Sequence, residues 1–165
     1  MADPLHIRAG SGEQVGVPAL GLDMRVLVPG HATAGEAFCL VREETKPGGG
    51  PPLHVHHRQT ELFVVQEGDY EFVAGDQRLR AGPGDVVVVP PGTPHAFRNA
   101  GTTTGAFLFL LTPALGGERF FREMAAMLRG GSGGPPDPAA MNALAEPYGL
   151  EFVGPPLGGE DAPPG

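Results

Sequence analysis

Short apolar segments recur between residues 22 and 112, with turn residues between them. Leu22, Met24, Val26 and Val28 alternate with the intervening positions, which is the period of a strand with one buried face. Further strands are expected at residues 37–42, 53–57, 61–67, 70–74, 77–80, 86–89, 95–99 and 106–112. Because Gly and Pro turns separate these segments and no helical period interrupts them, the pattern predicts an all-β fold, an antiparallel sandwich or small barrel.

The pattern changes after Pro113. Apolar residues then recur at helical spacing, at Phe120, Met124, Met127 and Leu128. Asp137 followed by Pro138 is typical of a helix N-cap and predicts a second short helix that ends at Ala145. Residues 150–153 are expected to add a strand or to dock on the surface. The C-terminal part is therefore predicted to carry two short helices.

The same pattern divides the chain into four parts, and its 165 residues are enough for one folded core. Residues 1–20 are weakly patterned and form an expected N-terminal arm. Residues 21–113 are predicted to form the β-barrel domain, and residues 114–153 its helical C-terminal extension. The Gly-rich piece at 130–138 is expected to be a flexible linker, and the tail at 154–165 to be disordered.

The expected assembly is a homodimer. The arm at residues 1–20 has too little core of its own, so we expect it to dock on a neighbouring sheet, either of its own chain or of a partner copy. The exposed sheet edges of a single barrel also favour association of two copies.

Charge and composition exclude several classes of partner. The formal net charge is −8, from 11 Lys and Arg against 19 Asp and Glu, so neither nucleic acid nor a membrane is an expected partner. No apolar segment is long enough to span a bilayer, and the first residues lack the features of a secretory signal. Cys39 is the one cysteine, which excludes an intrachain disulfide. We therefore expect a soluble, cytoplasmic protein with a small-molecule substrate.

Histidines and a carboxylate gather in the strand region. His54 and His56 are two residues apart, so a strand places both imidazoles on one face. Glu61 shares the face of its strand with Phe63, and a carboxylate that points into an apolar interior is costly unless it is paired or binds a metal. His95 begins a later strand, directly after a Pro-rich turn. Three neutral imidazoles and one carboxylate suit one divalent transition metal: Fe, Mn, Ni, Co, Cu or Zn.

Two ordered sets of residues resemble the motifs of the cupin superfamily. From residue 48 the chain reads Gly, five residues, His-x-His, four residues, Glu, six residues, Gly. From residue 84 it reads Gly, five residues, Pro-x-Gly, two residues, His, three residues, Asn. The ten fixed positions are Gly48, His54, His56, Glu61, Gly68, Gly84, Pro90, Gly92, His95 and Asn99. The gap of 15 residues between the two motifs is usual in bacterial single-domain cupins.

This resemblance implies a double-stranded β-helix, a jelly-roll barrel with a metal inside. It also implies a ligand set, with His54, His56, Glu61 and His95 at the positions of the family's metal ligands. Glu61 would serve in addition as the catalytic general base for a substrate hydroxyl. Asn99 is expected to stabilise a turn, and His57, which points away from the face of His56, is expected at the rim or in solvent.

The chain resembles more closely the quercetin 2,3-dioxygenase-like cupins. The similar segments are Pro-Pro-Leu-His-Val-His-His, Glu-Leu-Phe-Val-Val and Pro-His-Ala-Phe-Arg-Asn, followed by a late strand that leads into Gly-Gly-Glu-Arg-Phe-Phe-Arg-Glu. The resemblance implies a non-haem metal-dependent dioxygenase that acts on a small aromatic or enol substrate. Five phenylalanines could line an apolar pocket or belong to the barrel core: Phe63, Phe72, Phe97, Phe107 and Phe109.

Two other functions remain open at this point. A single barrel with no further catalytic motif is compatible with a non-catalytic module that binds a small molecule through the metal. A metal-dependent isomerase of a sugar or keto acid would need charged pocket residues. Four arginines could provide them, and alternation places no more than one of them inward: Arg42, Arg78, Arg80 and Arg98.

Overall fold

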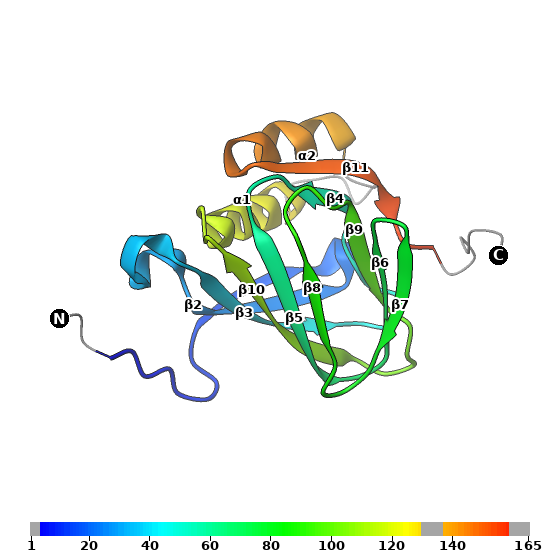
Figure 1. The fold of residues 1–165 in the computed structure, drawn as a ribbon, viewed down its shortest axis with the longest axis horizontal. Coiled ribbons are helices and arrows are strands. Elements are labelled where there is room, and N and C mark those ends of the chain that lie inside the picture. The colour runs from blue at the N-terminus through cyan, green and yellow to red at the C-terminus, as the bar shows by residue number, and fades with distance from the viewer. Residues whose placement is uncertain (1–3, 130–136, 159–165) are drawn as a thin grey trace.

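The computed structural model describes residues 4–129 and 137–158, which form two antiparallel sheets that face each other (Figure 1). The six-stranded sheet has the order β1 (Glu13–Val17), β2 (Leu22–Val28), β3 (Cys39–Thr45), β10 (Gly105–Thr112), β5 (Thr60–Glu67) and β8 (Val86–Val89). The five-stranded sheet has the order β11 (Leu150–Pro156), β4 (Pro52–His56), β9 (His95–Asn99), β6 (Tyr70–Ala74) and β7 (Gln77–Ala81). The predicted all-β barrel is confirmed.

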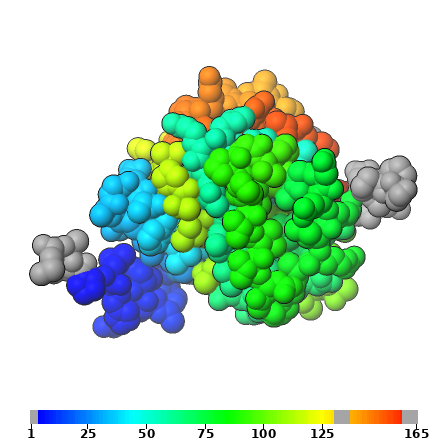
Figure 2. Space-filling model, in the orientation of Figure 1, coloured from blue at the N-terminus to red at the C-terminus, as the bar shows by residue number. Residues whose placement is uncertain are grey.

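Two helices follow the barrel, as predicted. They are α1 (Gly117–Arg129) and α2 (Pro138–Ala145), and the side chain of Asp137 caps α2 by accepting a hydrogen bond from the amide of Ala139. Helix α1 packs against β1 and α2 against β11, so that α2 and β11 lie across one end of the barrel (Figures 1 and 2). Short 3₁₀ turns occur at Pro18–Leu20, Gly30–Ala32, Ala34–Glu36 and Glu146–Tyr148.

The N-terminal segment docks on its own chain. Strand β1 pairs with β2 in antiparallel register, from Glu13 opposite Val26 to Val17 opposite Leu22. Val15 and Val17 are buried, so this segment extends the six-stranded sheet and contributes to the core. The homodimer and its partner interface remain predictions.

Two segments differ from the sequence expectations. The strand expected at 37–42 lies at Cys39–Thr45, because residues 34–36 form a 3₁₀ turn. The first residues of the expected disordered tail belong to β11, which ends at Pro156. The rest of that tail, from residue 159, and the linker at 130–136 lie outside the described residues.

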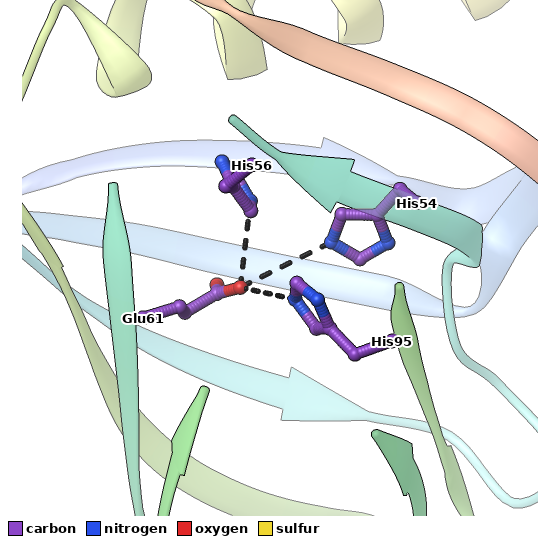
Figure 3. A group of neighbouring side chains, drawn as sticks. All are labelled: His54, His56, Glu61 and His95. Carbon is purple, nitrogen blue, oxygen red and sulfur yellow. Dashed lines mark hydrogen bonds and ion pairs between the residues drawn. The ribbon is translucent and has the colours of Figure 1, made fainter. Parts of the chain in front are cut away.

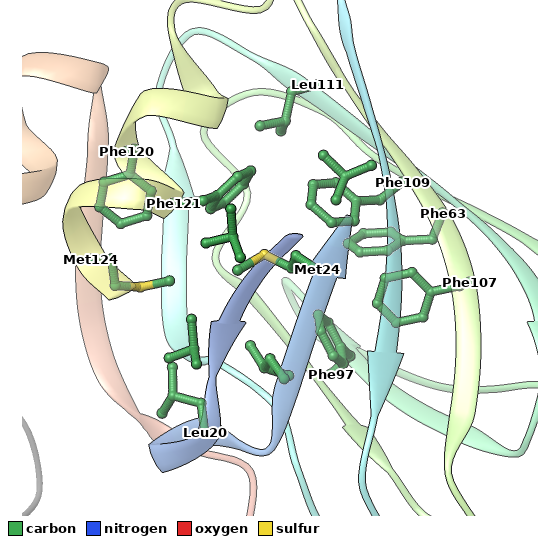
Figure 4. Packing of buried hydrophobic residues seen from close by; sticks show 14 of the residues in the cluster. Leu20, Met24, Phe63, Phe97, Phe107, Phe109, Leu111, Phe120, Phe121 and Met124 are labelled. Carbon is green, nitrogen blue, oxygen red and sulfur yellow. The ribbon is translucent and has the colours of Figure 1, made fainter. Parts of the chain in front are cut away.

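Aromatic side chains fill one part of the barrel interior. Phe63, Phe97 and Phe107 pack edge to face, with ring centroids 5.0 to 5.8 Å apart (Figure 4). Tyr70 packs against Phe107 and Phe72 against Phe97. Edge-to-face pairs at such distances add stability beyond their buried area. None of the helices in residues 4–129 and 137–158 is both long and apolar enough to cross a membrane.

Candidate metal centre

Three strands from both sheets bring the four sequence-predicted ligands together. His54 and His56 lie on β4 and share a face, and β4 pairs with β9 so that His54 is opposite His95. Glu61 begins the inward face of β5 in the other sheet. Figure 3 shows the three imidazoles around the carboxylate. The four side chains therefore converge inside the barrel, as the resemblance to the cupin motifs implies.

The carboxylate oxygen Oε2 of Glu61 is the centre of the cluster. It lies 2.8 Å from Nε2 of His95, 3.4 Å from Nε2 of His56 and 4.0 Å from Nε2 of His54. One donor atom from each of the four residues lies within 4.8 Å of the others, and all four residues are buried. Four donors at such separations can turn toward one central cation without movement of the backbone.

The second nitrogen of each imidazole is held by an oxygen atom. Nδ1 of His54 bonds to the carbonyl of Pro52 at 2.8 Å, and Nδ1 of His95 to the carbonyl of Thr93 at 2.9 Å. Nδ1 of His56 bonds to Oε1 of Gln59 at 2.9 Å. Because these oxygens can only accept, each Nδ1 donates a proton to its partner. Nε2 of His95 donates in turn to Oε2 of Glu61 and would have to release that proton to bind a metal. Outer hydrogen bonds of this kind orient imidazole ligands at metal sites.

The electrostatics of the cluster also suit a cation. Burial holds the pKa of His54 well below its usual value, and the neighbouring His95 and His56 lower it further, so this imidazole is neutral. Burial would raise the pKa of Glu61, but His56 and His95 outweigh it and lower the pKa below its usual value. Burial would lower the pKa of His95, whereas the hydrogen bond to Glu61 raises it overall. An ionised carboxylate therefore lies among three imidazoles inside the barrel.

These donors fit a divalent transition metal. Imidazole nitrogen and carboxylate oxygen are the ligands that Fe, Mn, Ni, Co, Cu and Zn accept, and four protein ligands leave positions open for a substrate or water. His54, His56, Glu61 and His95 are the residues that could hold the ion. Among the described residues, no other group of His, Cys, Asp and Glu side chains converges in this way.

A small apolar cavity of about 50 Å³ adjoins the cluster. Phe63, Phe97 and Phe109 line it from the strands, whereas Phe72 and Phe107 belong to the core below it. Helix α1 and β11 complete the wall with Phe120, Phe121, Met124, Leu150 and Phe152. No Lys or Arg among the described residues lines the cavity. A space of this size holds a few water molecules, so a large ring enters only if the cover moves.

The residues outside the ligand set behave as expected from the motifs. Asn99 stabilises a turn, because its amide nitrogen donates to the carbonyls of Thr45 and Thr103 and its oxygen accepts from the amide of Gly101. His57 lies exposed at the rim, with Nε2 2.9 Å from a carboxylate oxygen of Glu151. Both predictions are confirmed.

Two buried polar residues near the cluster were not found by sequence reasoning. Gln59 accepts a hydrogen bond from His56, and its amide nitrogen donates to the carbonyls of Pro113 and Ala114, which connects the cluster to the segment before α1. Glu43 lines the cavity from β3. Gln59 has no periodic signal because it lies in a turn, and Glu43 lies in a polar run in which alternation is not visible.

Comparison with known proteins agrees with this site and fold. The model of the cupin domain matches residues 41–111. Quercetin 2,3-dioxygenase from Bacillus subtilis is 30% identical over 95 residues, which cover 58% of this chain and 27% of that protein. The chain thus matches about a quarter of the length of this relative.

Solved structures with a similar fold include two with a sequence identity of at least 25% to this chain. A sugar phosphate isomerase of the cupin superfamily from Silicibacter pomeroyi is 25% identical, with a TM-score of 0.57 over 66% of this chain and 75% of that one. The polyketide cyclase RemF from Streptomyces resistomycificus is 26% identical, with a TM-score of 0.55 over 68% of this chain and 80% of that one. Residues 41–111 thus match the cupin domain in sequence, and the two facing sheets that contain them have the jelly-roll fold of these cupin structures.

Proposed function

We propose that the protein is a non-haem metal-dependent dioxygenase that acts on a small aromatic or enol substrate. The observation that carries this proposal is the buried cluster of His54, His56, Glu61 and His95 beside an apolar, phenylalanine-lined cavity. The similarity to quercetin 2,3-dioxygenase over 95 residues supports the same reaction class. In this reaction both atoms of dioxygen would enter the substrate.

Each residue of the cluster has a distinct part in this proposal. A divalent metal held there would act as a Lewis acid toward an enol or phenol oxygen. Each imidazole would bind the metal through Nε2, since each Nδ1 donates to an oxygen, and His95 would give up the Nε2 proton that it donates to Glu61 in this structure. Glu61 would be both a ligand and the general base that accepts the proton of the substrate hydroxyl. Phe63, Phe97 and Phe109 would exclude water and pack against the apolar body of the substrate.

An isomerase of a phosphorylated sugar is less compatible with the cavity. Such a substrate carries a dianion, which needs Lys or Arg in a dry site. No Lys or Arg lines the cavity in the described part of the chain. Arg78 and Arg98 bond instead to Glu71 on the outside of β6. A non-catalytic binding module uses the same cavity as a dioxygenase, and turnover separates the two functions.

Oxygen uptake tests the proposal. The purified protein would be loaded in turn with Fe(II), Mn(II), Ni(II), Co(II) and Cu(II), and mixed with a panel of small enols, catechols and flavonols in a closed oxygen electrode. We expect substrate-dependent oxygen uptake with at least one metal. Tight binding of a panel compound without oxygen uptake would instead establish the binding module.

Matched variants make the test specific. The double variant His54→Ala/His56→Ala should lose the activity because two of the four ligands are missing. His57→Ala removes an exposed imidazole next in sequence and should retain it. Equal activity in the two variants would contradict a reaction at the cluster.

A further inference from the structure

Glu43 is a second buried carboxyl group in the cavity. It lies on β3 in the six-stranded sheet, whereas the three histidines lie on β4 and β9 in the other sheet. Its side chain lines the same cavity as His54, His56 and Glu61, and the residue is only 3% exposed. The cavity is therefore polar on two sides and apolar between them.

The surroundings of Glu43 offer little to a negative charge. Its neighbours across the sheet are Met24 and Phe107, both of which belong to the apolar core (Figure 4). Thr45 donates to Oε1 at 3.0 Å, and this is its one hydrogen bond among the described residues. No Lys, Arg or His in residues 4–129 and 137–158 forms an ion pair with it.

A neutral carboxyl group is the form that such a site favours. Burial raises the pKa of Glu43 to about 8, with a further contribution from the negative charge of Glu61, although the hydrogen bond from Thr45 opposes the rise. A protonated carboxyl has one O–H donor. Thr45 engages Oε1, and Oε2 of Glu43 has no hydrogen bond among the described residues, so a proton on Oε2 has no partner there. A buried donor without a partner is costly, so an oxygen atom from outside the protein is its natural partner.

We propose that Glu43 binds a second oxygen atom of the substrate and thereby selects small apolar molecules with two oxygen functions. One oxygen faces the cluster of His54, His56, Glu61 and His95, and the other accepts a hydrogen bond from Glu43. This inference rests on the proposed function, since it takes the same cavity as the substrate site. It restricts the substrate class to diphenols, hydroxyketones and diketones and excludes simple phenols.

The first experiment needs no ligand. Difference infrared spectroscopy of the wild type and Glu43→Gln at neutral pH should give one protonated-carboxyl band that the variant lacks. Glu44→Gln is the matched control, because Glu44 is the next residue on the strand, is exposed and pairs with Arg42. Absence of the band from the metal-free wild type would show that Glu43 is ionised and would overturn the proposal.

The second experiment measures selectivity for two oxygen functions. Calorimetry with the Zn(II)-loaded protein would compare phenol with catechol, resorcinol and hydroquinone, which differ from phenol by one hydroxyl group. At least one diphenol should bind roughly tenfold more tightly than phenol, the size expected for a buried hydrogen bond to a polar group. Glu43→Leu should lose this advantage, and Glu43→Gln, which keeps a donor, should retain most of it.

The metal content of each variant separates the two proposals. Equal zinc in the wild type, Glu43→Leu and Glu43→Gln is expected, and a loss in the Glu43 variants would mean that this carboxylate is a ligand instead. An unchanged preference for the diphenol in Glu43→Leu would also overturn the inference. A wild type that takes up no metal would contradict the proposed function, while the infrared band would still decide the state of Glu43.

Discussion

The barrel interior has two adjacent levels of buried side chains, one formed by imidazoles and a carboxylate and the other by aromatic rings. On β5, Glu61 and Phe63 are two residues apart and share the inward face, and on β9 the same holds for His95 and Phe97. The first level is the imidazole and carboxylate cluster, and the second is the aromatic packing of Phe63, Phe97 and Phe107. Two strands, β5 from one sheet and β9 from the other, thus contribute side chains both to the candidate reaction centre and to the aromatic core next to it.

The two levels are expected to contribute differently to stability and to metal binding. Aromatic side chains gain free energy when they leave water, whereas buried imidazoles and carboxylates do so only if they are fully paired or bind a cation. The aromatic level should therefore carry the stability of the barrel. The polar level should contribute little to stability without a metal and should be essential for metal binding.

The largest expected effect is on the aromatic level. Phe63→Ala should lower the free energy of unfolding by about 3 to 5 kcal/mol, because it leaves a cavity among four other rings. His54→Leu, on the polar level, should change the stability of the metal-free protein by no more than about 1 kcal/mol, since the volume is similar and one hydrogen bond is lost. Urea unfolding of both variants measures this difference. Equal losses of unfolding free energy would contradict the different roles of the two levels.

The next effect is on metal affinity. His95→Ala should weaken metal binding by more than about 100-fold, beyond what outer residues of a metal site contribute. A competition titration with a chromophoric chelator measures the dissociation constant. His57→Ala should bind as the wild type does, and a His95→Ala variant with wild-type affinity would remove His95 from the ligand set.

Gln59 is not a candidate ligand, but its hydrogen bond to His56 should also affect metal affinity. Gln59→Leu should weaken metal binding by about 10- to 100-fold, because His56 loses the oxygen that fixes its ring and its protonated Nδ1. Gln66→Leu is the control, since Gln66 is an exposed glutamine on β5. An affinity that is unchanged in Gln59→Leu would show that the ring of His56 is fixed by packing alone.

The smallest effect concerns charges outside the barrel. Hydrogen bonds from Arg78 and Arg98 lower the pKa of Glu71 from 4.5 to about 2. A carboxylate with a lowered pKa stabilises the fold above pH 4.5, and this contribution disappears as the pH falls toward 2. Glu71→Gln should therefore lose about 1 kcal/mol at pH 7 and almost nothing at pH 2. Chemical denaturation of the wild type and the variant at pH 7 and pH 2 measures these losses. Equal losses of unfolding free energy at the two pH values would contradict an ionic origin of this stabilisation.

Local patterns in the sequence were sufficient for most strands and for the four clustered residues. Alternation of apolar residues predicted β2, and the fixed period of a strand predicted that His54 and His56 share a face. Their convergence with Glu61 and His95 followed from the resemblance to the cupin motifs. The Asp137-Pro138 pair predicted the start of α2, since capping is also a local interaction.

Features that depend on distant contacts were not predictable in this way. The pairing of β1 with β2 is not evident from the weak pattern of residues 13–17, and the inward position of Glu43 follows from where β3 begins. Gln59 acquires its role only because residues 113 and 114 come close in the folded chain. Polar residues that face inward cannot be distinguished from surface residues until the neighbouring strands are known.

The metal content of the purified protein tests the central claim most directly. The wild type and His54→Ala/His56→Ala would be produced side by side in medium supplemented with transition metals, desalted, and analysed by elemental mass spectrometry. The wild type should retain about one divalent metal ion per chain, as expected for one mononuclear site, and the double variant almost none. Equal metal content in the two proteins, or none in either, would contradict a metal centre formed by these residues.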